Sequence, residues 1–324
     1  MSKVTKNIVV LDRGNYTTCS VHLHGGTILS YRVKNKEILY MRKKTAFNHF
    51  APISGGIKFT FPYFGAQSYG PKHGFARYVP WNLEQGPTVR KDGNVEAVFT
   101  LVESEYTKAI WNYKFKISVR LTLCISELRV SVKVANTSKY FPFRFTILRH
   151  SIFKVEDVRK CEIYGLSGCK YVRLNENMTT ALDPDPDMEK LVIRRPYLDL
   201  FLETPSEIEL RNIDAHGLKL RLKTTDATST DVLICNPWEG NSLNSEDQNI
   251  SADEYLHCLG VGNGHLSTDI RLEPMQMWQA HHIIEVVDDE YEKRIDELGR
   301  LLDNPLLLFK DTCKLTDVYS TSHK

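Results

Sequence analysis

The sequence lacks several features that define common classes of protein. Its seven cysteines form no Cys-x-x-Cys pair, and their odd number fits reduced thiols better than a disulfide framework or a zinc site. No apolar run approaches the roughly 18 residues of a membrane span, and the N-terminus lacks the apolar core of a signal peptide. We therefore expect a cytoplasmic protein with no membrane partner.

An excess of charge of one sign is also missing. The 42 basic and 40 acidic side chains nearly cancel, and runs such as Arg42-Lys43-Lys44 are too short to form a nucleic-acid track. The chain has no dinucleotide-binding glycine fingerprint and no Walker-type phosphate loop. We expect no nucleic-acid partner, and a doubly wound α/β fold is disfavoured.

Strands dominate the residues before about 285. Hydrophobic residues at 42% and charged residues at 25% are ordinary globular values, so a sizeable core is available. Side chains alternate between apolar and polar over residues 113–123, 128–134 and 143–148, which is the pattern of half-buried strands. Their short connections suggest an antiparallel meander, and the fold class predicted is all-β, a large antiparallel β-sandwich.

The C-terminal segment has a different pattern. Tyr291, Ile295, Leu298 and Leu302 recur at three- and four-residue intervals, which predicts one amphipathic helix within residues 288–302. We expect a β-sandwich over residues 1–287 and an appended helix and tail over residues 288–324. The helix is interpreted either as a strut packed on the sandwich or as the contact with a partner protein.

Five separated motifs carry the strongest signal. In chain order they are residues 55–65 (Gly-Gly-Ile-Lys-Phe-Thr-Phe-Pro-Tyr-Phe-Gly), His73-Gly74-Phe75-Ala76-Arg77, Arg149-His150-Ser151-Ile152-Phe153, Asn236-Pro237-Trp238, and Asp253-Glu254-Tyr255 running into Gly262. Their order and spacing resemble the hexose-6-phosphate mutarotases, or glucose-6-phosphate 1-epimerases, of the aldose 1-epimerase family. The resemblance implies a galactose mutarotase-like sandwich that binds a sugar or sugar phosphate and needs no metal or organic cofactor.

Mutarotation exchanges two anomers of a sugar by opening its ring and closing it again. One group must take the proton of the anomeric hydroxyl while another protonates the ring oxygen. The resemblance makes His150 the catalytic histidine and implies substrate contacts for His73, Arg77 and Trp238. An imidazole suits a group that must act both as acid and as base, and a guanidinium suits sugar hydroxyls or phosphate oxygens.

The chain departs from the family pattern at several positions. Gly262 stands where relatives carry the catalytic glutamate, so the base position is vacant, and Glu239, Glu254 or His257 are alternatives that no motif places. Ser54 replaces an arginine, and Lys58 faces the same side of a strand and could supply the lost cation. Asp199 lies one residue from the position of a sugar-binding aspartate, and that step reverses the strand face.

Three hypotheses follow from these residues. The first is an active isomerase that interconverts the α and β anomers of a hexose 6-phosphate. The second is a pseudoenzyme that binds a carbohydrate or sugar phosphate without catalysis. The third is a structural subunit of a protein complex, with residues 288–324 as the contact with its partner.

Overall fold

The computed structural model of this chain describes residues 3–4, 6–43, 45, 47, 50–174, 179–184, 188–225, 230–238 and 253–287. The helix predicted within residues 288–302 lies outside the described residues, and so does Glu239. Within the described part, no helix combines the length and the apolar character needed to cross a bilayer.

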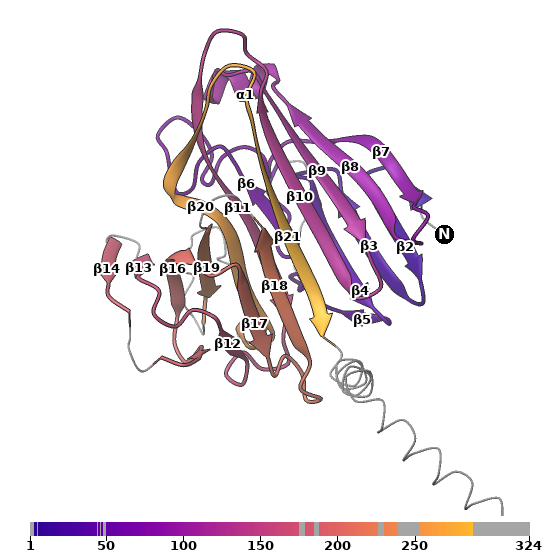
Figure 1. Cartoon of the computed structure of the whole chain (residues 1–324), viewed down its shortest axis with the longest axis vertical. Coiled ribbons are helices and arrows are strands. Elements are labelled where there is room, and N and C mark those ends of the chain that lie inside the picture. The colour runs from indigo at the N-terminus through magenta and orange to yellow at the C-terminus, as the bar shows by residue number, and fades with distance from the viewer. Residues whose placement is uncertain are drawn as a thin grey trace, which may run out of the picture. The chain divides into compact units, whose positions relative to one another are not determined.

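Two antiparallel sheets make up the described chain, and Figure 1 shows how their strands are arranged. The larger sheet has the order β1 (Lys3–Val4), β2 (Ile8–Gly14), β3 (Thr17–His22), β4 (Thr27–Val33), β6 (Ile57–Thr60), β11 (Phe143–Lys154), β20 (Cys258–Leu272), β19 (Thr230–Asn236), β16 (Tyr197–Thr204), β13 (Tyr171–Leu174) and β14 (Thr179–Leu182), with β5 (Lys36–Glu37) paired to β4. The smaller sheet has the order β15 (Leu191–Val192), β12 (Glu162–Tyr164), β17 (Glu207–Arg211), β18 (Lys219–Thr225), β21 (Met277–Val287), β10 (Glu127–Asn136), β9 (Phe115–Leu123), β8 (Val95–Val102) and β7 (Asn82–Val89).

The core lies between the two sheets. Along β9 and β10 every second side chain is buried, which is the period that the sequence predicted for half-buried strands. The inward side chains of both sheets join in one apolar cluster, including Phe59 and Phe145 of the larger sheet and Phe99 and Val132 of the smaller. The prediction of an all-β antiparallel sandwich is confirmed.

The predicted meander is wrong at its third strand. β9 pairs with β10, but the other neighbour of β10 is β21, and β11 lies in the larger sheet between β6 and β20. The buried amide of Asn136 holds the crossover, since its Nδ2 donates to the carbonyl oxygens of Phe141 at 2.9 Å and Leu272 at 3.2 Å. Alternation tells which face a side chain meets, but it does not tell which strand lies alongside.

Within the described residues, two short helical turns interrupt the strands. Helix α1 (Glu105–Ile110) begins with a capping box, in which the Thr107 amide donates to Oγ of Ser104 and the Ser104 amide donates to Oγ1 of Thr107. A 3₁₀ turn, η2 (Glu254–His257), leads directly into β20. It therefore sets the start of a strand that borders the candidate site.

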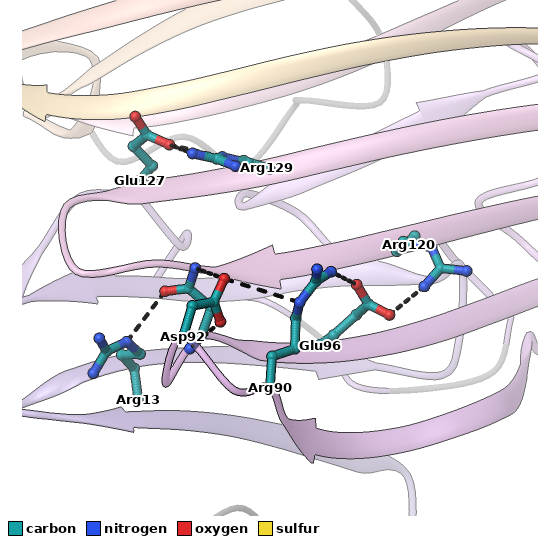
Figure 2. A network of polar contacts seen from close by, with 8 residues as sticks. Arg13, Arg90, Asp92, Glu96, Arg120, Glu127 and Arg129 are labelled. Atoms are coloured by element: carbon teal, nitrogen blue, oxygen red, sulfur yellow. Dashed lines mark hydrogen bonds and ion pairs between the residues drawn. The ribbon is translucent and has the colours of Figure 1, made fainter.

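The polar outer side of the smaller sheet carries charges that offset one another. Figure 2 shows the Glu96 carboxylate between the guanidinium groups of Arg90 and Arg120, and Arg129 paired with Glu127. Only 8% of the Glu96 side chain is exposed, so two cations compensate a nearly buried carboxylate. This part of the described surface therefore gives no sign of a single-charge track for a polyanion.

Candidate active site

His150 lies in the middle of the larger sheet, on the face turned away from the smaller sheet. Its strand neighbours Arg149 and Ser151 are buried, whereas the His150 side chain is partly exposed. Across the ladder His150 is opposite Lys58 of β6 on one side and Gly262 of β20 on the other. Side chains of directly opposed residues share a face, so Lys58 stands beside His150.

The loop after β6 supplies His73. This residue has a left-handed backbone with φ of 62°, and its Nδ1 accepts a hydrogen bond from the Gly65 amide at 3.0 Å. The ring of Phe64 contacts the imidazole, with 4.6 Å between ring centroids. Gly74 follows at φ of 73°, where a Cβ would collide with the carbonyl of Phe61. The glycine of the His-Gly motif is therefore required by the backbone conformation and by the close approach of Phe61.

Arg77 ends the same loop and is only 5% exposed. One of its terminal nitrogens, Nη2, donates to the carbonyl oxygen of Lys72 at 2.7 Å. The guanidinium carbon also lies 5.3 Å from the ring centroid of Tyr78. The hydrogen bond and the stacking contact both restrict the rotamers of a charged side chain that is almost buried.

Electrostatic effects link these four side chains. Burial is the main cause that lowers the pKa of His150 to about 3, and the charges of Lys58 and Arg77 add to it. Burial also lowers the pKa of His73 to about 2, with contributions from Arg77, Lys72, His150 and Lys58. Both imidazoles are therefore neutral at pH 7 and two permanent cations stand close to them, which is an arrangement that favours an anionic ligand.

Gly262, where the sequence pattern predicts the base position, has an apolar neighbour. A Cβ on Gly262 would lie 2.8 Å from Cδ1 of Leu148, the residue two positions before His150 on β11. Leu148, Leu200 and Leu233 form a small buried cluster on this face. Leucine methyl groups thus fill the space that a side chain at position 262 would enter.

One predicted substrate contact, Asp199, lies apart from the cluster. Asp199 is fully buried on the opposite face of the sheet, where Nε and Nη2 of Arg173 donate to its two oxygens at 3.1 and 3.0 Å. Trp238 follows the end of β19, and its ring lies 5.2 Å from that of Tyr255. The structure therefore brings together Lys58, His73, Arg77 and His150, and it places Asp199 on the other face. For Trp238 the substrate contact stays a prediction.

Two of the alternative bases also have other partners. Glu254 is buried, and its Oε1 accepts hydrogen bonds from the Tyr40 hydroxyl at 2.9 Å and from the Lys43 amide at 3.0 Å. Nδ1 of His257 lies 2.8 Å from the carbonyl oxygen of Glu156. Neither residue is among the groups that act on His150 or His73.

The sequence reasoning missed Cys235, which contacts the central histidine. Its Sγ lies 3.2 Å from Nε2 of His150. Cys235 immediately precedes the Asn236-Pro237-Trp238 motif, and alternation places it on the face opposite to the buried Asn236. The alternation along β19 could have indicated that Cys235 faces the outer side of the sheet. The sequence does not show which strands lie beside β19, so the contact with His150 could not be predicted.

No metal site accompanies the cluster in the described part of the chain, where no three His, Cys, Asp or Glu side chains converge. The chemistry available comes from imidazole, thiol, ammonium and guanidinium groups. These can hold an anion and move protons.

Comparison with known proteins identifies the family. Residues 7–285 match the family model described as aldose 1-epimerase. The chain belongs to the aldose 1-epimerase family. The match covers the sandwich from β2 into β21 and all the motifs that form the site, and it ends before residue 288.

Members of the aldose 1-epimerase family with similar sequences come from plants and bacteria. A Cenchrus ciliaris protein named "Putative glucose-6-phosphate 1-epimerase" is 26% identical over 289 residues, which are 87% of this chain and 85% of that protein. An Escherichia coli K12 protein of the same name is 29% identical over 198 residues, or 59% of this chain and 64% of that protein.

Solved structures of the aldose 1-epimerase type share the fold. A Salmonella typhimurium protein described as a "putative mutarotase" superposes with a TM-score of 0.74 at 20% identity, covering 89% of this chain and 93% of that one. A galactose mutarotase related enzyme from Lactobacillus acidophilus gives a TM-score of 0.68 at 14% identity, covering 89% and 98%. The galactose mutarotase-like sandwich is thereby shown.

Proposed function

We propose that this protein binds a hexose 6-phosphate on the outer face of its larger sheet and exchanges the α and β anomers. Membership of the aldose 1-epimerase family supports a sugar substrate, and the names of the relatives favour a phosphorylated one. The observation that carries the proposal is the convergence of Lys58, His73 and Arg77 on His150.

The phosphate is expected to bind to the cations of the site. The Arg77 guanidinium is held almost buried, and Lys58 stands beside His150 on the neighbouring strand. A phosphate dianion near these two groups would form charge-assisted hydrogen bonds, which are stronger than neutral ones. It would also offset the positive charges that add to burial in lowering the pKa of both imidazoles.

His150 is expected to carry a proton during ring opening. Because its pKa is lowered to about 3, the resting imidazole is neutral and a weak base. The charge of a bound phosphate would raise this pKa toward the range in which the ring accepts the proton of the anomeric hydroxyl. On ring closure the imidazolium returns a proton to the carbonyl oxygen. One histidine can therefore serve both directions of the exchange when a second group acts at the ring oxygen.

A second candidate is binding of the same ligand without catalysis. The observation that favours it is Gly262, because leucine methyl groups adjoin the space where relatives carry a glutamate. Such a protein would keep the cationic cluster as a sensor or carrier of sugar phosphates. In this case His150 would be a ligand contact and not a proton carrier.

Saturation-transfer NMR of glucose 6-phosphate separates the two candidates. An active epimerase raises the rate of magnetisation exchange between the α and β anomeric protons above the spontaneous rate. A binding protein broadens the anomeric signals and leaves the exchange rate unchanged. The absence of both effects would reject glucose 6-phosphate as ligand.

A further inference from the structure

The side chains of His150 on β11 and Cys235 on β19 contact each other across β20, the strand between them. In the sheet order β11-β20-β19, His150 is opposite Gly262, and Cys235 is opposite Gly260. Gly260, Gly262 and Gly264 alternate on β20, so the strand between the two side chains carries no side chain on this face. The imidazole and the thiol therefore reach toward each other over bare backbone.

Gly260 makes this contact possible. A Cβ at position 260 would lie 3.0 Å from Nε2 of His150 and closer still to Sγ of Cys235, nearer than real Cβ contacts come. Any other residue there would push the thiol and the imidazole apart. The backbone of Gly260 does not have a positive φ, so space and not backbone conformation is what requires the glycine.

The cations of the site bear on the protonation of His150. The charges of Lys58 and Arg77 add to burial in lowering the pKa of His150, so its ring is unprotonated in the resting site. Nearby cations also stabilise a thiolate relative to a thiol. A thiolate formed at Cys235, 3.2 Å from His150, would lie close to these cations.

We propose that Cys235 is the second proton-carrying group of the site and takes over the role left vacant at Gly262. This inference rests on the proposed function. In ring opening, Nε2 of His150 takes the proton from O1, the C1–O5 bond breaks as the C1=O bond forms, and the S–H of Cys235 protonates O5. The products are the open-chain aldehyde, an imidazolium and a thiolate.

Ring closure reverses every transfer on either face of the aldehyde. The thiolate takes the proton from the O5 hydroxyl, O5 attacks C1, and the imidazolium protonates O1. O1 and O5 are bonded to the same carbon, so a donor and an acceptor 3.2 Å apart can serve both oxygens at once. No proton is gained or lost over a full cycle, and no outside reagent is needed.

The test compares anomer exchange of glucose 6-phosphate in the full chain and its Cys235→Ala, Cys235→Ser and Cys169→Ser variants. Cys169 is a partly exposed thiol that lies outside the site and serves as the control. Loss of a positioned proton donor is expected to lower the rate at least about 100-fold in Cys235→Ala. The Cys235→Ser rate should also fall at least about tenfold, since a hydroxyl is a much weaker acid, while Cys169→Ser keeps the parental rate.

A thiol-specific readout separates proton transfer from packing. Capping with methyl methanethiosulfonate replaces the S–H proton by a small S–CH₃ group, and dithiothreitol restores the thiol. The exchange rate should fall on capping and recover on reduction in the Cys169→Ser protein, and glucose 6-phosphate should slow the capping of Cys235, as located by peptide mass spectrometry. Gly260→Ala should lower the rate with the thiol still present.

The outcomes distinguish this inference from the function on which it rests. If the parental protein accelerates exchange and folded Cys235→Ala stays within about threefold of it, Cys235 carries no proton and the proposed function stands. If the parental protein does not accelerate exchange, the proposed epimerase activity and the catalytic role of Cys235 are both rejected. In that case slower capping of Cys235 in the presence of glucose 6-phosphate still identifies a binding protein.

Discussion

Leu148 lies over Gly262, with its two methyl carbons 2.8 and 3.2 Å from where a Cβ would be built on that glycine. Leu148 is 1% exposed and packs with Leu200 and Leu233. Position 262, to which the sequence resemblance assigns the catalytic glutamate, therefore adjoins an apolar cluster. A return to glutamate at this position would need a second change beside it.

Substitution of Gly262 by glutamate is expected to destabilise the fold. The new side chain must displace Leu148, and overpacking of this kind costs about 1–3 kcal/mol. In a Leu148→Ala background the same substitution should cost less, because the space has been opened. Urea denaturation of the two single variants and the double variant measures the coupling. Additive costs would show that Leu148 does not occupy the glutamate position.

Lys58 and Arg77 should select for the phosphate. Removing a charged hydrogen-bonding group typically costs about 1.5–3 kcal/mol, so Lys58→Met and Arg77→Met should weaken glucose 6-phosphate binding roughly 10- to 100-fold. Binding of unphosphorylated glucose should change much less. Ligand-titration NMR with both sugars tests this, with Lys133→Met on the smaller sheet as the matched control. Equal losses for both sugars would contradict a phosphate role.

The Arg173–Asp199 pair should matter for stability and not for the sugar. Asp199 is fully buried, and the partly exposed Arg173 compensates its charge through a two-pronged contact. Arg173→Leu is expected to cost roughly 3 kcal/mol or less, and the Arg173→Leu/Asp199→Leu double variant should lose less than the single one. Folded Asp199→Asn should keep its affinity for glucose 6-phosphate. A weaker affinity in that variant would support the sugar contact expected from the sequence.

Acid should destabilise the protein through His282. Burial, with the charge of Arg149, lowers the pKa of this histidine to about 3, whereas an unfolded histidine titrates near 6.5. Between these values the unfolded chain binds the proton and the folded chain does not. The contribution of His282 to the free energy of unfolding is therefore fully present above about pH 6.5, and it falls as the pH is lowered toward 3.

Urea denaturation at pH 7.0 and pH 5.5 measures this contribution. Between the two values the parental protein should lose about 1 kcal/mol more free energy of unfolding than His282→Gln does. His216→Gln, in an exposed turn, should behave like the parental protein. Equal losses in the parental and His282→Gln proteins would show that His282 titrates normally.

Much of the fold could be predicted because alternation reports burial directly. The strong alternation over residues 113–134 correctly predicted β9 and β10, whose inward side chains belong to the apolar core. The strand after them was assigned to the wrong sheet, since the neighbour of β10 is a strand about 150 residues later, β21. Helix α1 is one short capped turn, and six residues give too little periodicity to be recognised.

The site was predictable where a motif fixed it. Lys58 was placed by strand parity and His73, Arg77 and His150 by motifs, and the fold brings all four together. Asp199 shows the limit of the method, because one residue of register moved it to the opposite face. Cys235 could not be found, since its contact spans three strands and depends on a glycine in the middle one.

The most direct test of the account is the anomer exchange rate of glucose 6-phosphate with the parental protein, His150→Gln and His216→Gln. We expect the parental and His216→Gln proteins to accelerate exchange above the spontaneous rate. The His150→Gln protein, still folded, should lose about 100- to 10,000-fold of that acceleration. Equal acceleration by His150→Gln and the parental protein would contradict the assignment of His150 as the proton carrier.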